Sequence, residues 1–165
     1  MEKQIVAEES SGNRGAKNQQ TARAGEYYVA AELNRRGAYA VTFAGNMPKI
    51  DIMASNLDQS RIVTIQVKTK RSGTWHTSID EGRPCESRVP ETAFWVFIDI
   101  GSSKKHPEFC IVPDWWIRNN IHKTHQDYLN RHGGKRARSP KSKHHAIGEK
   151  RIKQWKDKWG LLDVF

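Results

Sequence analysis

The chain of 165 residues is long enough for one globular domain and short for two. Its formal net charge of +10 favours a polyanionic partner, above all nucleic acid. No apolar run approaches the roughly 20 residues that cross a bilayer, no signal-peptide segment stands at the N-terminus, and two cysteines make neither a disulfide framework nor a zinc motif. We therefore expect an intracellular, cytoplasmic protein with reduced thiols and no membrane partner.

The first 70 residues of the chain predict an arm, a helix and three strands. Residues 1–20 are polar and lack periodic apolar positions, so we expect a flexible arm and a domain over residues 21–165. A helical pattern follows, with Thr21 as its N-cap and Gly37 as its C-terminal cap. Strands are predicted at residues 38–44, 49–55 and 61–70, and the turn signals between them indicate a meander.

The rest of the chain predicts two more strands among loops and helices. Residues 71–92 are rich in Gly, Ser, Pro and charged side chains and predict a long loop, after which residues 93–100 and 108–113 read as strands. We expect a short helix from Asp114, a mobile basic loop over residues 132–145, and a C-terminal helix that packs its tryptophans on the core. The element order predicts an α/β fold: a single domain with a mixed central sheet of about five strands, flanked by helices.

Glu26 is the first candidate for chemistry. It lies within the apolar stripe of the predicted helix, at helical spacing from Val29, Ala30 and Leu33, so its carboxylate points towards the sheet. A buried carboxylate normally has a cation, a metal or a proton beside it. The alternative is a boundary residue in the first helical turn, where the helix dipole favours an acid.

Two neighbouring strands supply the other candidates. Asp51 interrupts the apolar run around Ile50 and Ile52, and aspartate is a poor strand former. Gln66 and Lys68 share the polar face of the strand 61–70. Asp51, the Gln66 amide and the main-chain carbonyl of Val67 offer the oxygen ligands that Mg²⁺ takes, while Lys68 could orient or deprotonate a water. An exposed strand start and a solvated strand face are the alternatives.

These residues resemble the signature of the PD-(D/E)XK nuclease superfamily, the restriction-endonuclease-like fold. The family has a helix glutamate, an aspartate on its second strand and an acid-Xaa-Lys on its third, matched here by Glu26, Asp51 and the "QVK" of residues 66–68. The resemblance covers residues 21–113, the expected core, and leaves residues 114–165 as a basic extension. It implies metal-dependent hydrolysis of DNA phosphodiesters with Mg²⁺ or Mn²⁺, and Glu26 as a supporting ligand.

Two departures from the family pattern stand out. The motif proline is displaced, since Pro48 precedes Asp51 by three residues. Gln66 stands where the family usually has Asp or Glu, and a neutral amide donates an oxygen without a negative charge. Metal affinity therefore falls unless another acid compensates, for which Glu26 is the candidate. Mrr-like restriction nucleases also carry Gln-Xaa-Lys, so the change does not by itself imply a dead site.

Basic residues define the expected nucleic-acid contacts. Residues 1–100 hold 13 Lys and Arg against 12 Asp and Glu, whereas residues 101–165 hold 15 against 6. Residues that border the site or belong to the basic segment are candidates for binding phosphate, with a solvated loop as the alternative for the latter: Asn46, Lys70, Arg71, Lys135, Arg136 and Arg138. Trp75, Trp115 and Trp116 are candidates for stacking on bases, although we expect the last two in the core.

The sequence thus predicts an endodeoxyribonuclease acting on double-stranded or branched DNA, a homodimer being possible and a bacterial, nucleoid-associated setting expected. The principal alternative is a catalytically degenerate nuclease fold that only binds DNA or RNA. An RNA-processing role is a third.

Overall fold

A five-stranded mixed sheet forms the centre of the structure, a computed structural model that describes residues 2–43, 47–136 and 139–165 and the side chains from residue 15 onward. The strands lie in the order β1-β2-β3-β5-β6, and β3 and β5 are parallel while the other pairs are antiparallel. Their bounds are Tyr39–Thr42, Ile52–Ser55, Ile62–Lys70, Ala93–Asp99 and Glu108–Pro113. The predicted mixed sheet of about five strands is confirmed.

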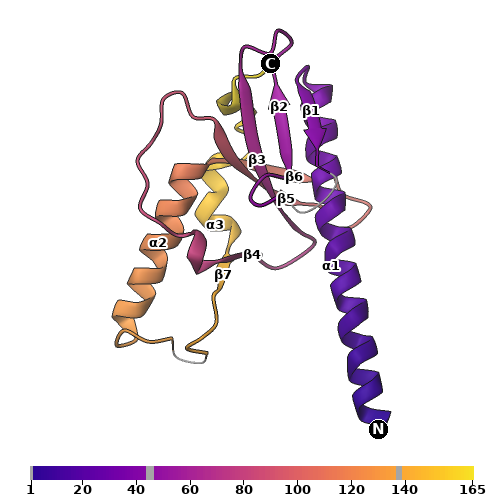
Figure 1. Cartoon of the computed structure of the whole chain (residues 1–165), viewed down its shortest axis with the longest axis vertical. Helices are drawn as coiled ribbons and strands as arrows, with labels where there is room; N and C mark the ends of the chain where they lie inside the picture. Colours follow the sequence, from indigo (N-terminus) through magenta and orange to yellow (C-terminus); the bar gives the residue numbers. More distant parts are fainter. Residues whose placement is uncertain (1, 44–46, 137–138) are drawn as a thin grey trace.

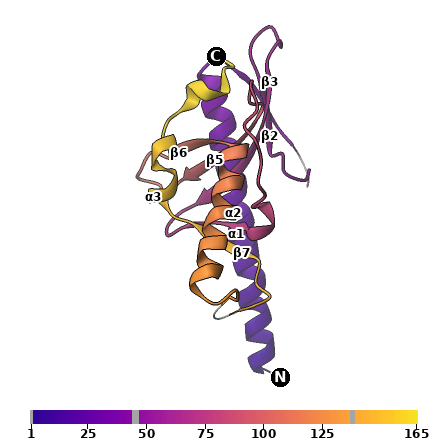
Figure 2. The ribbon, with the colours of Figure 1, turned by 90° about the vertical axis from the view of Figure 1, so that its left-hand side faces the viewer.

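Two long helices cover opposite faces of this sheet (Figure 1). Helix α1 (Glu2–Arg35) packs Val29 and Leu33 on the face that carries Val63 and Ile65 of β3. Helix α2 (Asp114–Arg131) packs Ile117 and Ile121 on the other face, against Trp95 and Phe97 of β5. The view turned by 90° shows α1 behind the sheet and α2 in front of it (Figure 2). The alternating side chains of β5 therefore reach two separate hydrophobic clusters, with Phe94 and Val96 on the α1 side and Trp95 and Phe97 on the α2 side.

Helix α1 begins at Glu2 and not at Thr21, so residues 2–20 are helical where the sequence predicts a flexible arm. Its N-terminal half extends beyond the sheet (Figure 1). Residues 2–20 contain Ala, Glu, Gln and Lys, which favour helix, and they continue a helix whose later turns are held by packing. None of the helices in the described part of the chain is long and apolar enough to cross a membrane.

A second, two-stranded sheet lies where the sequence predicts loops. Strand β4 (Trp75–Ser78) and the 3-10 helix η1 (Ile79–Glu81) occupy the segment 71–92, and β4 pairs antiparallel with β7 (His144–Ile147). The C-terminal segment is three short pieces rather than one helix: α3 (Glu149–Ile152), η2 (Lys153–Trp155) and η3 (Trp159–Leu162). Asp157, with a φ of 54°, separates the last two, since a left-handed residue interrupts a helix.

The tryptophans belong mainly to the core. Trp75 is 2% exposed and its indole N–H donates to the carbonyl of Ile98 at 2.9 Å, so the prediction that it stacks on bases is wrong. Trp116 packs against Trp155 beside the α2-side cluster, as expected for a core residue, and Trp115 is half-buried.

At Gly25, α1 lies directly against β3. A Cβ atom built on Gly25 would lie 1.9 Å from Oγ1 of Thr69, whose branched side chain stands on β3. Only a residue without a side chain lets the helix lie this close to the strand. Because Glu26 directly follows Gly25, the same contact sets the position of Glu26 relative to the sheet.

Gly25→Ala is expected to lower the free energy of unfolding by about 1–3 kcal/mol, because the added methyl group overpacks the helix-sheet contact. Chemical denaturation measures the change. Gly15→Ala is the matched control on the same helix, since nothing lies within 4 Å of a Cβ atom there. The control should be neutral or stabilising by up to about 1 kcal/mol. Equal effects of the two substitutions would contradict the close approach.

Candidate functional site

The candidate site lies where the ladder between β2 and β3 ends. Ile52 pairs with Ile65, yet the N–H of Asp51 also reaches the carbonyl of Ile65, at 2.9 Å. Two successive residues thus oppose one, which is the arrangement of a β-bulge, and bulges re-aim side chains. The strand predicted at residues 49–55 therefore begins only at Ile52, and Asp51 directly precedes it. Oδ2 of Asp51 instead accepts the N–H of Val67 at 2.6 Å.

The backbone of Val67 faces the same gap as the Asp51 carboxylate. In an extended strand the N–H and C=O of one residue point to the same side. Because the N–H of Val67 meets Asp51, its carbonyl oxygen also points to the side of β3 where β2 has ended. An acidic side chain and a main-chain oxygen are thus presented together at this edge.

Gln66 and Lys68 project from the face of β3 that α2 covers. They lie opposite Trp95 and Phe97 of β5, and Nζ of Lys68 is 5.4 Å from the ring centroid of Trp95. Both side chains are half-buried. Burial lowers the pKa of Lys68, and the nearby carboxylates of Asp51 and Glu81 oppose that change. Lys68 is therefore an ammonium that loses its proton more readily than one in water.

Glu26 approaches the site from the α1 side. Its side chain is 14% exposed, and Oε2 lies 2.8 Å from Nη1 of Arg23. Of the alternatives that the sequence leaves open for a buried carboxylate, the structure supplies the cation. Glu26 and Asp51 line one cavity of about 380 Å³ between α1 and the segment that leads into β2. Neither carboxylate turns away into solvent.

Glu81 is an acidic residue of this region that the sequence analysis missed. Its Oε2 lies 3.5 Å from Nη1 of Arg118 and 3.8 Å from Nζ of Lys49, and its charge acts on Lys68. No spacing marks Glu81, because its position depends on the folding of residues 71–92 into β4 and η1. The only available signal was that Asp80 and Glu81 are adjacent acids in the predicted loop of residues 71–92.

The donor set at the end of β2 suits a hard divalent cation. Asp51, Gln66 and the Val67 carbonyl offer oxygen atoms, as Mg²⁺ requires. Only Asp51 among these three carries a negative charge. No group of three or more His, Cys, Asp or Glu with metal-binding geometry occurs in the residues that the structure describes. The residues therefore fit an oxygen-coordinated cation of modest affinity and do not fit a zinc-type site.

The residues expected to bind phosphate differ in their exposure to solvent. Lys70 is 8% exposed, and its Nζ lies 3.2 Å from Oδ2 of Asp99 and 3.9 Å from the ring centroid of Trp75. The prediction that Lys70 binds phosphate is therefore wrong, because its ammonium group is enclosed and paired. Arg71 and Lys135 are exposed, and Arg136 is half-buried. Asn46 and Arg138 lie outside the described residues.

Comparison with known proteins finds likenesses of structure only. No protein-family model matches the chain, and no curated protein matches its sequence. The Holliday junction resolvase Hjc of the archaeal hyperthermophile Archaeoglobus fulgidus superimposes with a TM-score of 0.49 and 16% identity, over 87% of this chain and 97% of that one. The bacterial homing endonuclease I-Ssp6803I gives 0.48 and 10%, over 87% and 89%. By name, the first neighbour is a resolvase and the second an endonuclease.

Asp51→Ala is expected to lower the free energy of unfolding by about 1–3 kcal/mol in metal-free buffer, because the N–H of Val67 loses its acceptor. Asp51→Asn is the matched control, since the amide oxygen can still accept that hydrogen bond. Chemical denaturation of both variants measures the difference. Equal stability of the two would show that the carboxylate does not hold the end of β2 to β3.

Proposed function

We propose that the protein is a metal-dependent endonuclease that hydrolyses phosphodiester bonds of double-stranded or branched DNA. The observation that carries the proposal is the Asp51 carboxylate fixed on the N–H of Val67, with the Val67 carbonyl beside it and Lys68 on the same strand. An acid, a neutral oxygen and a lysine with a lowered pKa thus lie where the start of β2 meets β3. The sequence resemblance to the PD-(D/E)XK signature supports the same assignment.

Each residue has a distinct role in this proposal. Asp51, Gln66 and the carbonyl of Val67 would hold Mg²⁺ or Mn²⁺, with Glu26 as a further ligand across the shared cavity, directly or through water. The cation, when bound, would polarise the phosphodiester and offset its charge. Lys68 would orient the attacking water at Nζ, and its lowered pKa favours the neutral amine that can take the proton of that water.

Sequence-independent attraction would bring DNA to the site. The net charge of +10 supplies a long-range field, and exposed cations such as Arg71 and Lys135 can contact phosphates. Binding of this kind weakens steeply as salt is added, because condensed counterions are released on association.

A nucleic-acid-binding module without cleavage is the second candidate, and one observation favours it. Gln66 is neutral and Glu26 is already paired with Arg23, which leaves Asp51 as the acid without an ion pair among the candidate ligands in the described chain. One carboxylate gives a weaker cation site than two.

Cleavage assays decide between the two candidates. With Mg²⁺ or Mn²⁺, the wild type should cut plasmid or four-way junction DNA, and Asp51→Asn and Lys68→Met should each lower the rate by about a hundredfold or more, the effect of removing a group that acts in the transition state. Lys104→Met removes an exposed charge elsewhere and should cut like the wild type. DNA binding without cutting by the wild type selects the binding module, and RNA in the same assay tests the third alternative.

Gln66→Glu should lower the Mg²⁺ concentration that gives half-maximal cleavage by about tenfold, because a second negative charge in a partly buried site attracts the cation strongly. The measurement is a titration of the cleavage rate with Mg²⁺. Gln126→Glu, on the exposed surface of α2, is the control for an added charge. No shift for Gln66→Glu would mean that residue 66 does not face the cation.

A further inference from the structure

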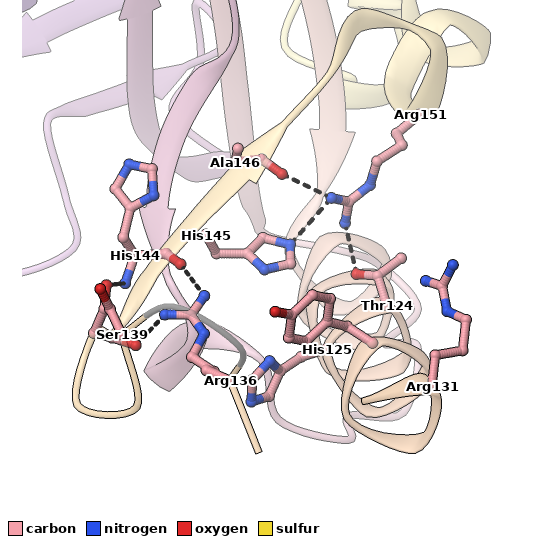
Figure 3. Close-up of a pocket in the computed structure, with 11 residues that line it drawn as sticks. Thr124, His125, Arg131, Arg136, Ser139, His144, His145, Ala146 and Arg151 are labelled. Carbon is pink, nitrogen blue, oxygen red and sulfur yellow. Dashed lines mark hydrogen bonds between the residues drawn. The ribbon is translucent and has the colours of Figure 1, made fainter. Parts of the chain in front are cut away.

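A second cavity lies beside the last turns of α2, and none of its lining residues belongs to the candidate nuclease site. It has a volume of about 450 Å³ and is bounded by α2, β7, α3 and the segment before β7 (Figure 3). Among the described residues that line it are three arginines and three histidines, and none is Asp or Glu: Arg131, Arg136, Arg151, His125, His144 and His145. The lining is therefore cationic or neutral throughout.

Arg151 is the charged group at the inner end of this cavity. Its guanidinium donates to Oδ1 of Asn120, to Oγ1 of Thr124 at 2.9 Å and to the carbonyl of Ala146 at 2.9 Å. All of these acceptors are neutral, and no carboxylate pairs with Arg151 in the described part of the chain. Burial lowers its pKa. Arg151 is half-buried, and a charged group in such a place normally has an anion beside it, so this positive charge is uncompensated.

His145 adds a hydrogen-bond donor to the cavity. Nη1 of Arg151 lies 3.0 Å from Nε2 of His145, and because arginine only donates, Nε2 must be the acceptor. The proton of the neutral ring is then on Nδ1. Burial first, and then the neighbouring basic groups Arg151, His125, Arg136 and His144, lower the pKa of His145 to about 4, so the ring is neutral at pH 7.

Two further arginines stand at the mouth of the cavity. Arg131 is exposed at the end of α2 and uses its Nε on the carbonyl of Asp127, and no carboxylate pairs with it within the described residues. Arg136 donates to the carbonyls of Ser142 and His144. Figure 3 shows these guanidinium groups on either side of His125 and His145. Planar guanidinium groups in this number match the oxygens of a phosphate better than those of a single carboxylate.

We propose that this cavity binds a phosphomonoester, either the terminal phosphate of a nucleic-acid strand or a free mononucleotide. A phosphomonoester carries close to two negative charges at neutral pH, whereas an internal phosphodiester carries one, so the uncompensated arginines select the end of a strand. The volume exceeds that of a phosphate alone and leaves room for part of a nucleoside. The phosphate chemistry does not depend on cleavage, and the strand end as its source rests on the proposed function.

Binding in metal-free buffer tests this site separately from the nuclease proposal. Asp51→Asn protein with EDTA is titrated with two single-stranded oligonucleotides of one sequence, one bearing a 5′-phosphate and the other a 5′-hydroxyl, and with a deoxynucleoside 5′-monophosphate as competitor. The 5′-phosphate should improve affinity about tenfold, the effect of one charge-assisted contact. If the mononucleotide displaces the 5′-phosphorylated oligonucleotide, the free nucleotide is also a ligand of the cavity, and the displacement curve gives its dissociation constant.

Arg131→Gln in the same background should remove the preference, because it deletes a guanidinium at the mouth without touching the buried network. Arg35→Gln is the matched control: it also deletes an exposed arginine, on α1, and should keep the preference. Inorganic phosphate should raise the pKa of His145, followed by NMR of the imidazole, because an anion stabilises the imidazolium. Equal affinity for both oligonucleotides together with no mononucleotide binding, or an unchanged preference in Arg131→Gln, would overturn the proposal.

Discussion

The hydrogen bond from the N–H of Val67 to the Asp51 carboxylate is the contact on which the candidate site depends. It forms because the ladder between β2 and β3 stops at the bulge of Asp51 and Ile52. The Asp51 side chain then takes the position of a backbone acceptor beside Val67. A backbone donor of a central strand is thereby satisfied by a charged side chain, which is stronger than a neutral pair. The same geometry puts the Val67 carbonyl on the side of β3 that carries the carboxylate, so the sheet itself supplies one of the two oxygens.

The order of the elements explains why the candidate residues come from both faces of the sheet. Helix α1 brings Glu26 from one face of the sheet, and the polar face of β3 brings Gln66 and Lys68 from the other. Asp51, at the strand end between the faces, shares a cavity with Glu26 and an electrostatic interaction with Lys68. Burial of Lys68 beside Trp95 then adjusts the chemistry, since a lysine in solvent would hold its proton more firmly.

The sheet could be predicted from the sequence because alternation along its strands is strong, as in the run from Val63 to Val67. The polar face of β3 followed from the same pattern. The bulge at Asp51 could not be predicted, because Asp51 directly precedes β2, and a strand of four residues gives too short a pattern to reveal a change in the alternation. Lys70 was misread for a related reason: its alternation indicates a polar face, and only the folded loop shows that Trp75 and Asp99 enclose its ammonium group.

Pairing between distant segments accounts for the other differences. Strands β4 and β7 are four residues each and lie far apart in the chain, and each is too short and polar to signal a strand alone. Their pairing creates the cationic cavity around Arg151 and His145, which the sequence shows only as scattered basic residues. The same pairing holds β4 and the following η1, which places the Glu81 carboxylate where its charge acts on Lys68. Local pattern predicts elements, whereas these contacts depend on tertiary structure.

The position of a bound cation tests the central claim most directly. A crystal of the protein soaked in Mn²⁺ and measured at an anomalous wavelength should show one ion within coordination distance of the Asp51 carboxylate and the Val67 carbonyl, with the Gln66 amide turned towards it. The ion should be absent from crystals of the Asp51→Asn variant. An ion bound elsewhere, or a wild-type crystal without manganese at the end of β2, would contradict a metal-dependent site on this strand.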